Sequence, residues 1–164
     1  MEQGSGDKKL RKYDVVVVGG GPAGLSCAIE VARLGANVAL IDENRSPGGQ
    51  LFKQIHKFFG SKSHRAGVRG FDIGMQLLRE LRQARVNTYL NTVVYGIFNN
   101  KMVGIAKNER TISTIQGEKI LLATGAIENS VVFPGWDLPG VMGAGAAQTM
   151  INIHRVLPGK RFVI

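Results

Sequence analysis

The 164-residue chain has one cysteine, few acidic residues and no apolar run as long as a membrane span. The single cysteine, Cys27, excludes an internal disulfide and a Cys-x-x-Cys redox pair, and we expect it to pack in the core. No Gly-Lys-Ser or Gly-Lys-Thr ends the glycine-rich loop, which argues against a nucleoside-triphosphate site. Residues 1–12 are polar and basic without the apolar region of a signal peptide, so the sequence predicts a cytoplasmic protein.

The scarcity of acids gives the chain a net charge of +9, from 21 Lys and Arg against 12 Asp and Glu. One basic cluster lies in residues 8–12, and no acid falls between Lys53 and Arg69. No nucleic-acid-binding motif accompanies the charge, so we expect no nucleic-acid partner. The second cluster is a candidate for holding phosphates, an acidic substrate or a partner subunit. Its members are Lys53, Lys57, Lys62, Arg65 and Arg69.

The sequence does contain the pattern of a nucleotide-binding α/β domain. Its apolar fraction of 44% and its length suit one globular domain with a buried core. Val15–Val18 has the composition of a buried parallel strand, and apolar residues then recur at helical spacing up to Gly35. Val38–Ile41 is a second apolar strand. This order predicts a Rossmann-like fold with a parallel sheet.

The loop between the first strand and the helix, residues 19–24, fits G-x-G-x-x-G. In a dinucleotide site Gly19 allows the tight turn, and Gly21 lets the backbone approach a pyrophosphate. Gly24 lets the helix lie close to the strand. The helix N-terminus offers free N–H groups and a partial positive charge to the phosphates.

An acid about 20 residues after such a loop accepts hydrogen bonds from a ribose hydroxyl. Asp42 is the better candidate because it directly follows the second strand, and we expect Glu43 to be its solvated neighbour. An acid here argues against a ribose 2′-phosphate, which prefers arginine. The alternative is an ordinary βαβ turn that binds no ligand.

The middle of the chain predicts loops and one more helix and strand. Residues 46–50 interrupt regular structure, and 51–71 should be mostly loop with a short helix near 52–59. Asp72 is expected to cap a helix whose apolar face carries Ile73, Leu77, Leu78 and Leu81. Val86–Leu90 should be a third strand.

The pattern changes at Thr92 and predicts an antiparallel β-meander inserted into the parallel unit. Its strands are expected at 93–98, 102–106, 111–115 and 119–123, with a turn at Gly117. Turn-rich sequence follows, and residues 144–156 then predict a helix with an apolar set of Ala146, Ala147, Met150, Ile151 and Ile153. Residues 160–164 predict the start of another strand, so we expect an N-terminal fragment of a longer protein.

Four motifs follow one another: the strand and loop of 15–24, the acid Asp42, the turn 48–50 and the strand end 123–125. Together they resemble the FAD half of flavoproteins with two dinucleotide-binding domains, the glutathione and thioredoxin reductase type. The segments 47–50, 123–128, 133–136 and 138–141 narrow this resemblance. They are similar to the flavoprotein α subunits of amine and amino-acid dehydrogenases, namely opine oxidase, hydrogen cyanide synthase, dye-linked proline dehydrogenase and sarcosine oxidase.

The resemblance implies a set of FAD-binding residues, in which the glycine loop would bind the pyrophosphate and Asp42 the adenosine ribose. Gly49 and Gln50 would approach the flavin-proximal part of the cofactor, and Val94 would lie near the adenine. The strand end would pack on the FAD. The full set is Gly19, Gly21, Pro22, Ala23, Gly24, Asp42, Glu43, Gly49, Gln50, Val94, Ala123, Thr124 and Gly125.

The resemblance also implies an organisation and an activity. Residues 1–12 would be a basic lead-in, 13–135 the N-terminal part of an FAD domain, and 136–164 a crossover and the start of a nicotinamide nucleotide domain. The parent would be an FAD-dependent oxidoreductase with an amine, amino-acid or related substrate, or an NAD(P)H-dependent reductase, working with partner subunits. NAD(P)H binding is expected only in the full-length parent, because the second G-x-G-x-x-G is missing here.

The sequence names no catalytic residue and no metal site. His56, His64 and His154 are candidates by residue type alone, and each is more often a surface or core histidine. We expect the chain alone to be inactive. Two alternatives stay open: a nucleotide-binding module or subunit without turnover, and a single-domain NAD-dependent dehydrogenase.

Overall fold

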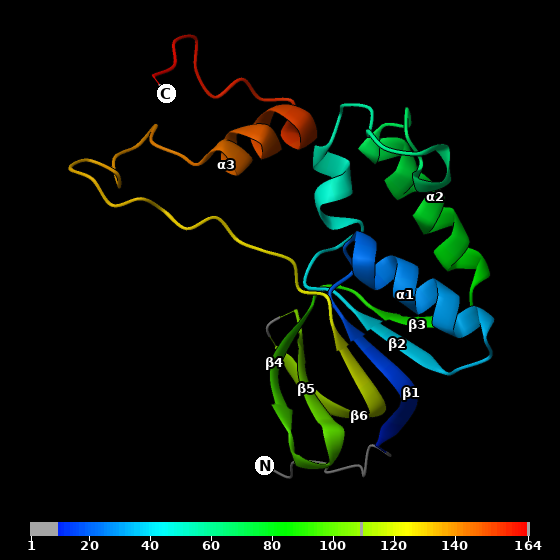
Figure 1. The fold of residues 1–164 in the computed structure, drawn as a ribbon. Helices are drawn as coiled ribbons and strands as arrows, with labels where there is room; N and C mark the ends of the chain where they lie inside the picture. Colours follow the sequence, from blue (N-terminus) through cyan, green and yellow to red (C-terminus); the bar gives the residue numbers. More distant parts are fainter. Residues whose placement is uncertain (1–9, 109, 164) are drawn as a thin grey trace, which may run out of the picture.

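The computed structural model describes residues 10–108 and 110–163, except the side chain of His64. Residues 1–9 of the predicted lead-in and Ile164 of the predicted last strand therefore lie outside the described part. A six-stranded sheet with the order β3-β2-β1-β6-β5-β4 forms the centre of the molecule (Figure 1). The predicted Rossmann-like architecture with an inserted meander is confirmed.

The parallel half of the sheet contains β1 (Arg11–Val18), β2 (Val38–Ile41) and β3 (Val86–Tyr89), and β6 runs parallel to β1 on the other side. Helices α1 (Pro22–Arg33) and α2 (Gly70–Gln83) cover one face of β1 to β3 (Figure 1). Their apolar stripes pack on the strands as amphipathic helices do. The buried residues of this layer include Val17, Leu25, Ile29, Leu40, Ile73 and Leu77.

The antiparallel half contains β4 (Thr92–Phe98), β5 (Met102–Lys107) and β6 (Thr111–Leu122). It packs over the other face of β1 and β2, where a second core includes Val16, Val18, Ile41, Val103, Ile105 and Ile115. The turn between β4 and β5 is the short helix η3 (Asn99–Lys101). The parallel strands therefore have an apolar layer on each face, as their continuous hydrophobic sequences require.

Gly117 does not form the predicted turn, because β6 continues through it and pairs it with Tyr13 of β1. A Cβ at Gly117 would lie 2.8 Å from Cγ2 of Val16. The glycine is therefore needed for close packing inside the sheet. The predicted strands 111–115 and 119–123 are one strand.

The connection from β2 to α2 contains two short 3-10 helices, η1 (Gly49–Lys53) and η2 (Lys62–His64). The predicted helix near 52–59 is wrong, because η1 begins earlier and ends at Lys53. Asp72 is not the cap of α2: the helix begins at Gly70, and Asp72 lies in its first turn. Arg69 is the N-cap, and Gly70 packs closely against the preceding loop, where a Cβ would lie 2.4 Å from Cβ of Gln54.

After β6 the chain leaves the sheet, and residues 123–143 have no helix or strand. They lead to α3 (Ala144–Thr149), which continues as the π-helix η4 (Met150–His154) and lies apart from the sheet, beside η1 (Figure 1). The predicted helix thus ends at His154, before Val156. Its apolar set is not a core face, since the side chains are half-buried or exposed.

Residues 160–163 form no strand, contrary to the prediction. A strand needs a hydrogen-bonded neighbour, and in the described part of the chain these residues have none. No helix among the described residues is long and apolar enough to cross a membrane.

Candidate functional site

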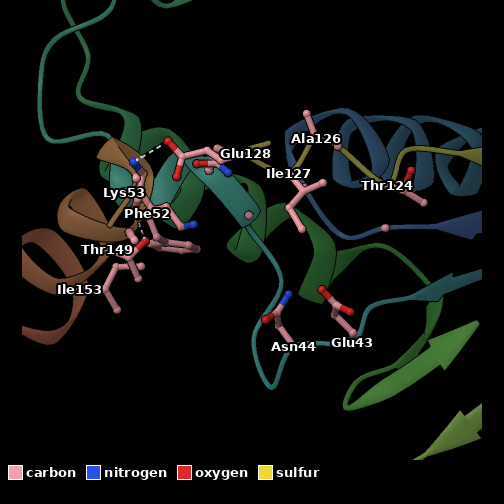
Figure 2. Close-up of a pocket in the computed structure, with 18 of the residues that line it drawn as sticks. Glu43, Asn44, Phe52, Lys53, Thr124, Ala126, Ile127, Glu128, Thr149 and Ile153 are labelled. Atoms are coloured by element: carbon pink, nitrogen blue, oxygen red, sulfur yellow. Dashed lines mark hydrogen bonds between the residues drawn. The ribbon is translucent and has the colours of Figure 1, made fainter. Parts of the chain in front are cut away.

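A cavity of about 2310 Å³ lies at the carboxyl ends of β1, β2 and β6 and extends to α3 and η4. It is larger than the roughly 300–1,000 Å³ of a site for a drug-sized ligand. Figure 2 shows part of its lining, with Glu43 and Asn44 distant from Lys53, Thr149 and Ile153. Of the predicted site residues, Gly24 alone does not line it. The lining includes Gly19, Gly21, Pro22, Ala23, Asp42, Glu43, Gly49, Gln50, Val94, Ala123, Thr124 and Gly125.

The glycine loop has the geometry that the sequence predicted. Gly19 has φ 102°, and a Cβ there would lie 2.3 Å from the carbonyl oxygen of Ala123. A Cβ at Gly24 would lie 1.8 Å from the carbonyl oxygen of Gly19, so only glycine lets α1 approach the loop this closely. Gly21 differs from both, because no heavy atom lies within 4 Å of the position its Cβ would occupy.

The N-terminus of α1 is free to bind an anion. Gly21 is the N-cap and makes no side-chain cap hydrogen bond, Pro22 begins the helix, and the first turn has no acidic residue. The N–H groups of Ala23 and Gly24 belong to the turn whose donors have no partner within the helix. The helix dipole adds a partial positive charge at the same point. An anion that binds beside Gly21 would contact the free N–H groups and lie at the positive end of the helix dipole.

Asp42 uses its carboxylate to hold the glycine loop. Its Oδ2 accepts a hydrogen bond from the Gly20 N–H at 2.5 Å. Its Oδ1 accepts two from Asn44, from the backbone N–H at 2.7 Å and from Nδ2 at 2.9 Å. The residue is 8% exposed. The loop therefore depends on this carboxylate.

Glu43 is exposed and lines the cavity beside Asn44 (Figure 2). Within the described part of the chain its carboxylate makes no hydrogen bond or ion pair. Sequence reasoning ranked Asp42 above Glu43 because of its place after the strand, and it missed Asn44. The geometry leaves Glu43 with the more available acceptor.

The turn 48–50 docks on the glycine loop. Gly48 and Gly49 have φ 132° and 53°, and the Gly48 N–H donates to the carbonyl oxygen of Gly20 at 2.7 Å. A Cβ at Gly49 would lie 3.0 Å from Cα of Gly21. Gln50 is exposed at the cavity wall. Two glycine-rich turns far apart in sequence thus form one surface.

The other predicted residues complete the wall. The Ala123 N–H donates to the carbonyl oxygen of Val18 at 2.8 Å, so the end of β6 stays beside β1. Thr124 and Gly125 then leave the sheet along the cavity. Val94 lies on β4, half-buried against the second core. Thr92, on the same strand, donates its backbone N–H to the carbonyl oxygen of Asp42 at 3.0 Å, which joins β4 to the site.

The basic cluster of the sequence is divided in space. Lys53 and Arg69 line the cavity, Lys57 and Lys62 do not, and Arg65 lies 3.9 Å from Glu80 in an ion pair. Sequence reasoning missed a set of lining residues because tertiary structure alone joins them. They include Phe52, Phe71, Asp72, Glu128, Thr149, Asn152 and Arg155.

Histidine side chains do not contribute to the described cavity wall. His56 and His154 do not line it. The candidate role of the His64 side chain falls outside the described part. Among the described residues no group of three or more His, Cys, Asp or Glu side chains is placed to hold a metal ion.

Comparisons with known proteins agree with this geometry. The family model described as pyridine nucleotide-disulphide oxidoreductase matches residues 13–163. An opine oxidase subunit of Agrobacterium tumefaciens (strain Ach5) is 34% identical over 161 residues, which cover 93% of this chain and 31% of that protein. Hydrogen cyanide synthase subunit HcnB of Pseudomonas aeruginosa is 36% identical over 87% of this chain and 31% of its own.

A solved structure, the L-proline dehydrogenase from P. horikoshii, superposes with a TM-score of 0.80 at 28% identity. The match covers 94% of this chain and 31% of that one. At this coverage the superposition extends beyond the sheet, into the segment 123–143 and α3. The chain therefore spans about a third of the length of these relatives.

Proposed function

The chain belongs to the pyridine nucleotide-disulphide oxidoreductase family, an FAD-binding family, and we propose that it holds the pyrophosphate and adenosine of FAD in an oxidoreductase. The observation that carries the proposal is the uncapped N-terminus of α1 beside the open position of Gly21. Ala123 and Gly49 pack closely on this loop. The site thus has a rigid backbone surface for a phosphate anion.

Different residues would bind different parts of the cofactor. The N–H groups of Ala23 and Gly24 would bind the pyrophosphate, and Glu43 would accept the ribose hydroxyl while Asp42 fixes the loop. Val94 would lie against the adenine. Gly49 and Gln50 would approach the flavin-proximal part, and residues 123–125 would pack along the cofactor. All of these residues except Gly24 line the cavity, and Gly24 follows Ala23 in the first turn of α1.

FAD, when bound, supplies hydride chemistry, and the protein supplies binding, orientation and electrostatics. Residues 13–135 would form the N-terminal part of the FAD domain, and 136–163 the crossover to a nicotinamide nucleotide domain of the full-length parent. No residue is assigned a proton-transfer role, since His56 and His154 lie off the cavity. With Cys27 alone the chain contains no dithiol pair for disulfide reduction.

An amine or amino acid is the proposed substrate class of the parent. The support is the similarity to a subunit of an opine oxidase and to an L-proline dehydrogenase. Two of the relatives are themselves subunits of larger enzymes, which supports partner subunits for the parent as well. These assignments concern the whole protein, of which this chain corresponds to about a third.

A reconstitution experiment tests the proposal. The purified chain is incubated with FAD, freed of excess cofactor and examined for flavin absorbance, with NADH as a parallel ligand. Retained flavin and no NADH binding support an FAD cradle. A chain that ignores FAD and binds NADH would instead be the NAD-dependent alternative. A chain that binds FAD but shows no turnover with its partner subunits present would be a non-catalytic module.

A further inference from the structure

Three basic residues reach the cavity from three separate segments. Lys53 ends η1, Arg69 precedes α2 and Arg155 follows η4. All three line the same cavity as Asp42 and Glu43. Since they are far apart in sequence, the fold alone assembles them.

Hydrogen bonds hold the three segments together. The Asn152 side-chain Nδ2 donates to the carbonyl oxygen of Lys53 at 2.7 Å, which fixes η4 on η1. The Phe71 N–H donates to the carbonyl oxygen of Gln54 at 3.2 Å, which fixes the start of α2 on the residue after Lys53. The segments that carry Arg69 and Arg155 therefore both contact the end of η1.

The three cations have no carboxylate partner among the described residues. The ion pairs of this part of the chain join Arg33 to Glu30 and Glu80 and Arg65 to Glu80. The nearby acids are otherwise placed: Glu128 accepts the Gly145 N–H at 2.9 Å, and Asp72 lies in the first turn of α2, where the helix dipole favours it. Three such cations that line one cavity attract an anion.

The local backbone at Arg155 is unusual. It follows the π-helix η4 and has φ 59°, in the left-handed region that non-glycine residues rarely occupy. The Val156 N–H donates to the carbonyl oxygen of Met150 at 3.0 Å and closes this helix end. Single π-turns and such backbone conformations concentrate at functional sites.

We propose that Lys53, Arg69 and Arg155 form an anion subsite that holds the carboxylate of a small organic substrate at the flavin-proximal end of the cavity. The N-terminus of α1 is the proposed binding site of the cofactor pyrophosphate. The three cations are therefore available to bind a second anion. Gly49 and Gln50 share η1 with Lys53, which places the subsite at that end. Its position relative to the flavin rests on the proposed function.

Benzoate and benzamide make a matched pair of probes, because they share a shape and differ in charge. Their binding to the chain, with and without FAD, is followed by ligand-observed NMR at constant ionic strength. Benzoate should bind more tightly than benzamide. Lys53→Gln, Arg69→Gln and Arg155→Gln should each weaken benzoate by about three- to tenfold. Lys119→Gln is the control, since it removes one exposed charge on β6 outside the cavity and should leave benzoate affinity unchanged.

The outcomes separate this subsite from the cofactor proposal. Equal binding of the two probes, or an equal loss of benzoate affinity in Lys119→Gln, would overturn the subsite. Displacement of benzoate by inorganic phosphate at far lower concentration than by acetate would make it a phosphate site and overturn the carboxylate assignment. FAD affinity of the same variants is measured in parallel. Benzoate binding by a wild-type chain that does not bind FAD would count against the cofactor proposal alone. Loss of FAD binding in the three variants with benzoate binding intact would overturn the subsite.

Discussion

Oδ2 of Asp42 lies 2.5 Å from the backbone nitrogen of Gly20, so the acid at the end of β2 holds the loop that precedes α1. The other oxygen, Oδ1, is engaged by Asn44. A carboxylate with this many protein donors has a structural role first. The exposed carboxylate of Glu43 is therefore available to bind a ligand.

Substitution of the two acids should therefore separate stability from affinity. Asp42→Asn places an amide against the Gly20 or Asn44 donors and should lower the free energy of unfolding by about 1–3 kcal/mol. Glu43→Gln should leave stability within about 0.5 kcal/mol, because the residue is exposed, and weaken FAD by about 1–3 kcal/mol. Urea unfolding and FAD titration measure the two effects. A large stability loss in Glu43→Gln would contradict the division of roles.

Gly24→Ala should destabilise the fold through a steric clash. The new methyl would lie 1.8 Å from the carbonyl oxygen of Gly19, so the loop or α1 must move. We expect a loss of about 1–3 kcal/mol or more in the free energy of unfolding. Gly21→Ala adds the same methyl in open space at φ −69° and is the matched control. Equal stability of the two variants in urea unfolding would contradict this packing.

Alkaline pH should weaken the fold through Tyr13. Burial, followed by a 2.6 Å hydrogen bond with the Tyr89 hydroxyl, raises the pKa of Tyr13 to about 12. The unfolded value is about 10. A raised pKa stabilises the neutral form in the folded state, so this contribution is complete below about pH 10 and is lost as the pH rises through about 12.

Urea midpoints across this pH range measure the effect. In Tyr89→Phe the partner hydroxyl is gone, so the pKa of Tyr13 should fall towards its unfolded value. The stability loss should still begin at about pH 10, but it should be smaller and complete at lower pH than in the wild type. Tyr95→Phe is the control, because it removes an exposed hydroxyl elsewhere in the sheet. Identical pH profiles for the wild type and Tyr89→Phe would rule out this hydrogen bond as a cause.

The sequence predicted the parts of the fold that local patterns determine. Val38–Ile41 is a strand with the predicted bounds, and Gly35 has the positive φ of a helix end. Both features depend on residues that are adjacent in sequence, so a local pattern is enough to predict them. Gly117 was misread as a turn because a glycine needed for close strand packing has the same sequence signal as a turn glycine.

The candidate site was predictable where it lies on a motif. Gly19, Gly21 and Ala123, which the motifs singled out, line one cavity. The roles of Asp42 and Asn44 depend on side-chain hydrogen bonds, and Arg155 follows a helix that docks on η1 through Asn152 and Lys53. Such contacts between distant segments leave no periodic signal in the sequence.

FAD titration of Gly21→Ala tests the central claim most directly. The added methyl meets no protein atom within 4 Å, so the fold should be unchanged, while the methyl should block the approach of the pyrophosphate to the loop. Gly159→Ala is the control, because its methyl makes ordinary contacts away from the cavity. We predict that Gly21→Ala unfolds in urea like the wild type and loses at least about tenfold in FAD affinity, a difference of about 1.4 kcal/mol, while Gly159→Ala retains it. Wild-type FAD affinity in a folded Gly21→Ala chain would contradict the account.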